Sequence, residues 1–180
     1  GYDVLDLPGG ASNVTHGEGV RRGIGYAVGI KNIGFSEGFD DYSTARARIQ
    51  IVNGEPVVEI HTAAAEVGQG LVTLKGQIAR TELGVQRVVV HVSDTQVGSA
   101  GSTSASRQSY VTGGAVQTAC KALRDDILLL AMEKLGHLHP HLLHFRSQYR
   151  LVDGEIRDGE GHLVTSLADL RSEEHTSELQ

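Results

Sequence analysis

Only one cysteine, Cys120, is present, which excludes an intrachain disulfide and a metal centre built from several cysteines. Basic residues are also few: 16 Lys and Arg stand against 22 Asp and Glu, a formal net charge of -6. Because nucleic-acid-binding proteins need a basic face, no nucleic-acid partner is expected. No apolar run approaches the about 20 residues that span a membrane, and no signal-peptide pattern is visible. We therefore expect a globular, cytoplasmic protein without a membrane partner.

The length of 180 residues suits one domain with its own hydrophobic core. Residues 1–22 show no periodicity and are expected to form an irregular lead-in. Residues 171–180 match the translation of a common sequencing-library adapter and are excluded as an adapter-derived scar, with a polar helical tail as the alternative. The domain is therefore expected at 23–170. Since the chain also opens on Gly1 and not on Met, we expect a fragment of a longer protein.

Periodicity within 23–170 predicts strands that alternate with helices. The expected strands cover 24–33, 44–52, 57–62 and 88–92, and the expected helices cover 70–83, 109–135 and 164–170. Asn53–Gly54 is a tight-turn signal, and Asp153–Gly154 predicts a small hairpin over 149–156. The run at 88–92 is continuously apolar and is expected to be a buried strand. This order indicates an α+β domain with α/β-like layers, in which a hairpin of a mixed sheet is followed by helix, strand and helix.

Two glycine-punctuated helix starts are the strongest functional signal. The first, at 66–70, reads Glu-Val-Gly-Gln-Gly, and the second, at 98–108, reads Gly-Ser-Ala-Gly-Ser-Thr-Ser-Ala-Ser-Arg-Gln. Each follows a predicted strand and opens a predicted helix, where free backbone N–H groups are available to an anion. Two such places indicate one extended, phosphate-bearing ligand held at two points. The alternatives are a polar helix cap for the first segment and a solvated linker for the second.

Individual side chains in both segments suit such a ligand. Gln69 lies between two glycines, and its amide can both donate and accept hydrogen bonds. In the second segment a row of hydroxyl groups precedes the positive charge of Arg107, a combination suited to phosphate or diphosphate. These hydroxyls belong to Ser99, Ser102, Thr103, Ser104 and Ser106. No Gly-Lys-Ser/Thr follows at the right spacing, so the segment is not a Walker A loop.

Three further features favour structural roles. Glu37, Asp40 and Asp41 are expected to form a solvated turn rather than a cation site. The four histidines within 137–144 resemble a metal tract, but no carboxylate or cysteine completes the set nearby. Adventitious nickel or zinc binding is expected there, and no metal site is assigned. Cys120 has apolar neighbours on a predicted helix and is expected to be buried and inert.

Together, these segments resemble the molybdopterin-binding catalytic subunit of the xanthine dehydrogenase and aldehyde oxidase family. The resemblance covers roughly residues 17–170 and includes the two helix starts in order, the second continuing to residue 113. Upstream, Gly-Tyr-Ala-Val-Gly-Ile-Lys-Asn at 25–32 and Gly-Phe-Asp-Asp at 38–41 look like bacterial purine-oxidising members. The resemblance thus implies the bacterial purine-oxidising type.

The resemblance also implies which residues hold a molybdenum cofactor, either as molybdopterin or as its cytosine dinucleotide. Gln69, with Gly68 and Gly70 beside it, is expected to contact the pterin near the metal. The second helix start is expected to bind pterin and phosphate through Thr103, Ser104, Ala105 and Ser106, with Arg107 and Gln108 toward the phosphate or nucleotide side. Iron–sulfur and FAD subunits or domains are expected as partners that carry electrons away.

The implied activity is a xanthine dehydrogenase-type oxidative hydroxylation of hypoxanthine or xanthine, with water as the oxygen source and a glutamate as general base. An aldehyde or other N-heterocycle oxidoreductase on the same scaffold is one alternative, and a non-catalytic module that binds pterins or nucleotides is another. The glutamate base is expected downstream of this chain. No residue here is therefore assigned a catalytic role, and the fragment alone is expected to be inactive.

Overall fold

The computed structural model describes residues 24–30, 33, 40–134 and 148–172. It separates the chain into two units, residues 1–31 and 32–180. The described residues of the first unit have no regular secondary structure, and Tyr26, Val28 and Ile30 are exposed. The strand expected at 24–33 is therefore wrong for these residues, because a strand needs a hydrogen-bonded neighbour and the described chain pairs none with them. The lead-in at 1–22 and the histidines within 137–144 lie outside the described residues.

The second unit begins with a three-stranded mixed sheet in the order β1-β2-β3. Strands β1 (Arg46–Val52) and β2 (Glu55–His61) form the expected antiparallel hairpin. Its turn residues Asn53 and Gly54 have φ values of 54° and 83°, and the tight two-residue hairpin turn requires both to be positive. Strand β3 (Arg87–His91) pairs in parallel with β2, with His91 opposite His61. A parallel neighbour needs a crossover, which helix α1 provides.

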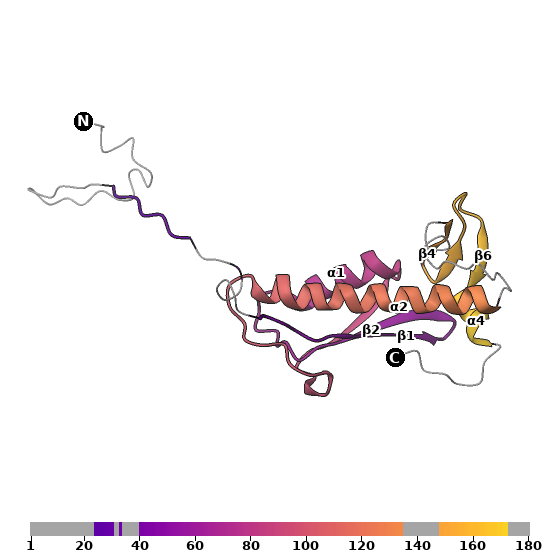
Figure 1. Cartoon of the computed structure of the whole chain (residues 1–180), viewed down its shortest axis with the longest axis horizontal. Coiled ribbons are helices and arrows are strands. Elements are labelled where there is room, and N and C mark those ends of the chain that lie inside the picture. The colour runs from indigo at the N-terminus through magenta and orange to yellow at the C-terminus, as the bar shows by residue number, and fades with distance from the viewer. Residues whose placement is uncertain (1–23, 31–32, 34–39, 135–147, 173–180) are drawn as a thin grey trace, which may run out of the picture. The chain divides into compact units, whose positions relative to one another are not determined.

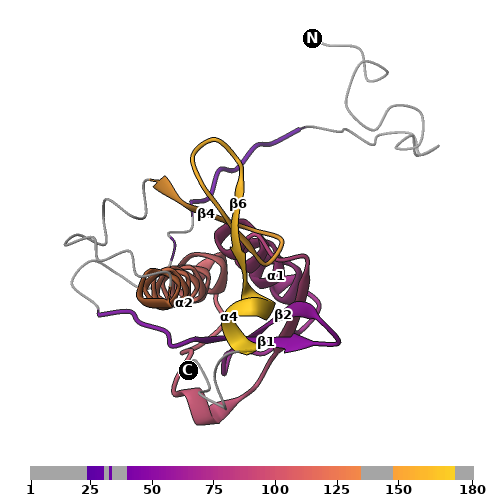
Figure 2. The ribbon, with the colours of Figure 1, turned by 90° about the vertical axis from the view of Figure 1, so that its right-hand side faces the viewer.

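Helix α1 (Leu71–Leu83) confirms the helix expected at 70–83, with Gly70 and Gly84 in left-handed conformations at its ends. Helix α2 (Gly113–Lys134) starts later than expected, because one π-helical turn, η4 (Gln108–Thr112), precedes it. A 3-10 turn, η3 (Thr95–Val97), follows β3. Both long helices pack on one face of the sheet, as the view along α2 in Figure 2 shows. Figure 1 shows α2 running lengthwise over β1 and β2.

The main core lies between this sheet face and the two helices. Val58 and Ile60 of β2 face inward and pack with Val116 and Cys120 of α2. Burial raises the pKa of the Cys120 thiol to about 12, so the expectation of a buried, inert cysteine is confirmed. The expectation of a buried β3 is wrong, since Val89 is 44% exposed. Helices cover only one face of the sheet within the described part of the chain, and β3 lies at its edge.

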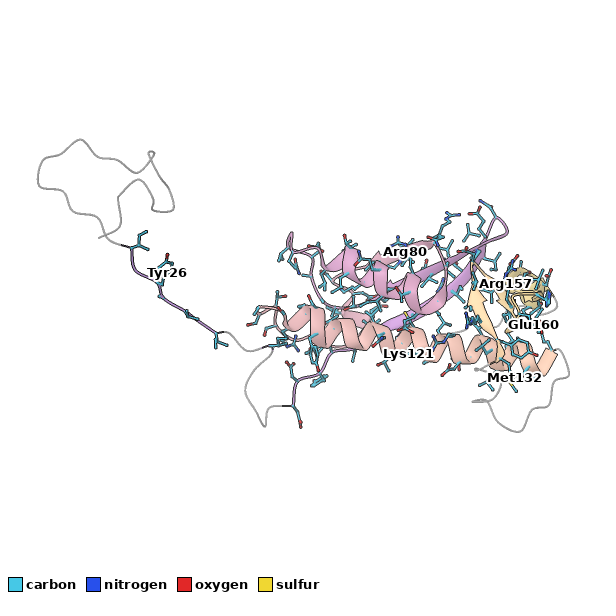
Figure 3. The ribbon with its side chains drawn as sticks, turned by 90° about the horizontal axis from the view of Figure 1, so that it is seen from above. Tyr26, Arg80, Lys121, Met132, Arg157 and Glu160 are labelled. Atoms are coloured by element: carbon cyan, nitrogen blue, oxygen red, sulfur yellow. The ribbon has the colours of Figure 1, made fainter. Side chains whose placement is uncertain are left out.

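A second, antiparallel sheet lies at the far end of α2. Strands β4 (Arg150–Val152) and β5 (Glu155–Arg157) confirm the expected hairpin. The helix expected at 164–170 is only partly present: strand β6 (Leu163–Ser166) pairs with β5 first, and helix α4 (Leu167–Ser172) follows. Met132 of α2 joins the same hydrophobic core as Ile156 of β5, and Figure 3 places it beside the second sheet. The expected α+β class is confirmed.

No helix among the described residues is both long enough and apolar enough to cross a bilayer.

Candidate functional site

The fold brings the two glycine-punctuated helix starts together. One follows β2 and the other follows β3, so both leave the carboxyl ends of adjacent parallel strands, where open α/β sheets bind ligands. Ala64 and Leu71, which flank the first segment, pack with Ala100 of the second in a small separate hydrophobic cluster. Segments 66–70 and 99–106, here called the first and second loops, are therefore neighbours on one edge of the molecule.

In the first loop, the carboxylate of Glu66 occupies the start of α1. One of its oxygens accepts hydrogen bonds from the Gly68 and Gly70 N–H groups at 2.8 and 3.1 Å, and the other accepts from the Val72 N–H at 2.8 Å. These bonds, the one from Val72 foremost, lower the pKa of Glu66. The expectation that these N–H groups are free for an external anion is therefore wrong here, since the chain supplies its own carboxylate.

Gln69 lies exposed at the tip of the first loop. Its Oε1 accepts from the Val67 N–H at 2.6 Å, and its Nε2 donates to the Ala65 carbonyl at 3.0 Å. The flanking Gly68 and Gly70 have φ values of 99° and 78°, which a residue with a side chain rarely adopts. A primary amide offers two hydrogens and two lone pairs, so these bonds orient the group and leave capacity for a ligand.

Behind the second loop lies the guanidinium of Arg107, only 1% exposed. Its Nε is 2.8 and 2.9 Å from the two carboxylate oxygens of Asp41, and its Nη2 also donates to that carboxylate. Further bonds go to the carbonyls of Ala100 at 2.7 Å and Ser102 at 2.9 Å. Asp41 is thus a half-buried ion-pair partner with a side chain 15% exposed, and its expected place in a solvated turn is wrong. The two residues are 66 positions apart, beyond any local pattern.

Gln108 supports the loop from the same side. Its Nε2 lies 3.2–3.4 Å from the carbonyl oxygens of Ala100, Gly101 and Ser102. Its Oε1 accepts from the hydroxyl of Thr112, which also lies 2.9 Å from the hydroxyl of Ser43. Arg107 and Gln108 were expected on the phosphate side of a ligand. The N–H groups described here instead donate to carbonyl oxygens of the loop itself. Whether either also touches a ligand stays a prediction.

These inward bonds determine what the second loop presents outward. All described peptide bonds are trans, so the carbonyl and the N–H of one peptide group point in opposite directions. Because the carbonyls of Gly101 and Ser102 point inward at Gln108, the N–H groups of the next residues, Ser102 and Thr103, point outward. Backbone N–H groups of successive residues that point the same way can together bind an anion. The N–H groups of the second loop are therefore suited to bind the phosphate of a cofactor.

The remaining loop residues lie around this outward surface. The side chains of Ser102, Thr103, Ala105 and Ser106 are exposed, and Ser104 is half-buried. Ala105 has a φ of 44°, a left-handed conformation that turns the chain into η4. Exposed hydroxyls and outward N–H groups are the donors that phosphate oxygens need.

Lys75 of α1 is a buried cation next to the first loop. Its residue is fully buried, and its Nζ lies 3.5 Å from the Ala64 carbonyl. Burial lowers the pKa of Lys75 to about 8, although the negative charge of Glu66 opposes this shift. A folded pKa below the ordinary 10.5 means that the charged form is disfavoured by folding.

We expect Lys75→Met to raise the free energy of unfolding at pH 7 by about 1–3 kcal/mol, because a buried charge is replaced by an apolar chain. In the unsubstituted protein, the unfolded lysine keeps a proton between about pH 8 and 10.5 that the folded one loses, so stability should rise with pH across this window. Urea unfolding from pH 7 to 10.5 measures both effects. Lys121→Met on exposed α2 surface is the control, and equal pH slopes in both variants would contradict the prediction.

Comparison with known proteins places this arrangement in a family. The sequence matches the family model of the molybdopterin cofactor-binding domain over residues 8–178. It is 33% identical to aldehyde oxidase 2 of Macaca fascicularis over 118 residues, which are 63% of this chain and 8% of that protein. The chain therefore spans a small part of that relative.

Two solved structures share the fold. Quinoline 2-oxidoreductase from Pseudomonas putida 86 matches with a TM-score of 0.57 and 24% identity, over 72% of this chain and 16% of that one. The Cu,Mo-CO dehydrogenase matches with a TM-score of 0.57 and 21% identity, over 74% of this chain and 16% of that one. At these identities the likeness concerns the fold alone. The family match over nearly the whole length shows that this chain belongs to the molybdopterin cofactor-binding domain family.

Proposed function

We propose that this chain is the cofactor-binding part of a molybdenum hydroxylase and that its two loops hold the cofactor between them. The observation that carries the proposal is the second loop, where Arg107 and Gln108 draw the carbonyls inward and so turn the N–H groups of Ser102 and Thr103 outward. That surface suits phosphate, and the adjacent first loop presents the Gln69 amide, which suits the mixed nitrogen and oxygen edge of a pterin.

Each residue has a distinct part in this proposal. Gln69 would bind the pterin edge, with Gly68 and Gly70 allowing close approach. Thr103, Ser104, Ala105 and Ser106 would bind pterin and phosphate, while Arg107 and Gln108 would keep the loop in its binding shape. When bound, the cofactor supplies oxidative hydroxylation with water as the oxygen source. The surroundings of Glu59 and Glu66 give neither the role of general base, since Glu66 accepts three backbone N–H bonds and Glu59 accepts from Gln50.

The finer proposal is that the whole protein hydroxylates hypoxanthine or xanthine, in the cytoplasm, with iron–sulfur and FAD partners and molybdopterin or its cytosine dinucleotide. It rests on the sequence segments at 25–32 and 38–41. A specific observation favours the alternative of an aldehyde or N-heterocycle oxidoreductase, since the relative that matches in sequence is an aldehyde oxidase. Turnover of hypoxanthine, an aldehyde and quinoline by the full-length protein decides between them, and the purine proposal fails if hypoxanthine has the lowest kcat/KM.

Cofactor binding can be tested on this chain directly. The chain is produced in a host that makes the molybdenum cofactor, and bound pterin is measured by fluorescence after oxidation, with molybdenum measured by mass spectrometry. We expect Gln69→Ala to lower the retained pterin roughly tenfold, the effect of losing about 1.4 kcal/mol of hydrogen bonding. Gln77→Ala, an exposed glutamine further along α1, is the matched control.

Two results would count against the proposed site. Absence of pterin from the unsubstituted chain would contradict cofactor binding by these loops, and equal pterin in the Gln69→Ala and Gln77→Ala variants would contradict the contact with Gln69. Pterin binding by the chain without turnover of any substrate by the full-length protein would favour the non-catalytic module.

A further inference from the structure

Metal-ligand side chains gather on the sheet face opposite the helices. Glu59 and His61 are two residues apart on β2, so they point to the same side, away from the inward-facing Val58 and Ile60. His91 lies opposite His61 in the parallel register with β3. One ligand atom from each of the three residues lies within 4.8 Å of the others. Nε2 of His61 is 3.8 Å from one Glu59 oxygen, and Nε2 of His91 is 4.0 Å from the other.

A fourth residue, Asp94, orients His61 for metal binding. Its Oδ2 is 2.9 Å from Nδ1 of His61, and because a carboxylate only accepts, Nδ1 carries the hydrogen. In the neutral imidazole the lone pair is therefore on Nε2, the atom that faces Glu59. Asp94 is itself held in place, since its Oδ1 accepts from the Gln96 N–H at 3.0 Å and its N–H donates to the Thr62 carbonyl. A carboxylate behind a histidine is the usual outer partner of a metal ligand.

We propose that Glu59, His61 and His91 bind a divalent transition-metal ion, with Zn²⁺ as the ion that two imidazoles and one carboxylate suit, and with water completing the coordination. Two adjustments bring the ligands together. The stacked rings of His61 and His91, with centroids 4.3 Å apart, separate as the His91 side chain turns about its Cα–Cβ bond, for which its exposure leaves room. Arg48, whose Nε is 3.3 Å from Glu59, gives up that contact to the ion.

The site lies where the two cofactor loops begin. His61 is the last residue of β2 and His91 is the last residue of β3, so an ion between them would tie together the strand ends from which both loops leave. Arg46, opposite His61 in the β1–β2 register, is a further cation on this face, and it leaves the local charge near balance with Arg48, Glu59 and Asp94. Arg87, further along β3, faces the same side but pairs with Glu55 at 2.8 Å. An ion at this position does not require a cofactor in the two loops.

The test must separate this cluster from the histidines within 137–144. We therefore use the full chain carrying His137→Gln, His139→Gln, His141→Gln and His144→Gln, and measure Zn²⁺ binding by competition with a chromophoric chelator. We expect one Zn²⁺ per chain and, with Co²⁺ as the probe, an absorption spectrum of a four-coordinate site. Absence of stoichiometric Zn²⁺ binding in this chain would overturn the proposal.

Three further substitutions in that chain test the assignment of residues. His91→Gln should weaken Zn²⁺ binding by more than the about 10–100-fold expected for Asp94→Asn, which removes only an outer partner. Arg48→Gln should tighten binding, because the competing cation is gone. His162→Gln, at an exposed histidine near the second sheet, is the control and should change nothing. Equal affinity in the His91 and His162 variants, with circular dichroism showing both folded, would mean adventitious binding and overturn the proposal.

Discussion

Asp41→Ala is expected to lower the free energy of unfolding by about 3–5 kcal/mol, because it leaves the buried guanidinium of Arg107 without its countercharge. The pair is well shielded from water: the side chains are 15% and 1% exposed, and Nε of Arg107 is 2.8 and 2.9 Å from the two Asp41 oxygens. Breaking such a pair costs more than the pair itself contributes, since the remaining charge stays buried. Equilibrium unfolding in urea measures the change.

Its neighbour provides the matched control. Asp40 is exposed, so Asp40→Ala should change the unfolding free energy by less than about 0.5 kcal/mol. Adding Arg107→Met to Asp41→Ala should recover part of the loss, because the stranded charge is then removed. Equal effects of the Asp40 and Asp41 substitutions would mean that the ion pair does not stabilise the fold.

The same substitution connects stability to the candidate site. Arg107 donates to the carbonyls of Ala100 and Ser102 while it is held by Asp41, and the inward direction of these carbonyls turns the following N–H groups outward. A guanidinium released from Asp41 would no longer hold the second loop in this shape. Retained pterin should therefore fall in Asp41→Ala at a temperature where the variant is still folded, and remain unchanged in Asp40→Ala.

Sequence reasoning succeeded where the signal is local. The Asn53–Gly54 turn, the ends of α1 at Gly70 and Gly84, and the hairpin around Asp153–Gly154 were all predictable, since each depends on residues that tolerate positive φ. The sequence predicted one ligand held at the two helix starts, and the parallel pairing of β2 with β3, which places the carboxyl ends of both strands together, was not predicted.

Sequence-based prediction failed for features that depend on contacts between residues distant in the sequence. The apolar run in β3 indicated burial on both faces, yet only packing reveals that one face of the sheet is uncovered within the described residues. The partners Asp41 and Arg107 are far apart in sequence, and the Gly-Phe-Asp-Asp segment was the one available signal for that aspartate.

The alternation of Glu59 and His61 along β2 could have suggested that both side chains share one face of the sheet, but adding His91 needs the β2–β3 register. The carboxylate of Glu66 fulfils the alternative of a polar helix cap for the first segment, but no local pattern assigned that role to this residue.

Gly101→Ala is expected to lower the free energy of unfolding by about 2–4 kcal/mol, the sum of a backbone cost and a steric cost. The backbone cost arises because Gly101 has a φ of 62°, where a residue with a side chain is strained. The steric cost arises because an added Cβ would lie 2.8 Å from Cζ of Arg107, against a guanidinium that the surrounding hydrogen bonds hold in place. The second loop should deform with it, so retained pterin should fall as well.

Two other glycines separate these costs. Gly68 has a positive φ but no atom within 4 Å of an added Cβ, so Gly68→Ala should show the backbone cost alone, about 1 kcal/mol. Gly114 on α2 has open space and a helical backbone, so Gly114→Ala should stabilise the protein by about 0.5–1 kcal/mol. If the guanidinium is the obstacle, Gly101→Ala in an Arg107→Met background should cost no more than Gly68→Ala. An undiminished cost in that background would place the strain in the loop backbone and remove Arg107 as the reason why residue 101 must be glycine.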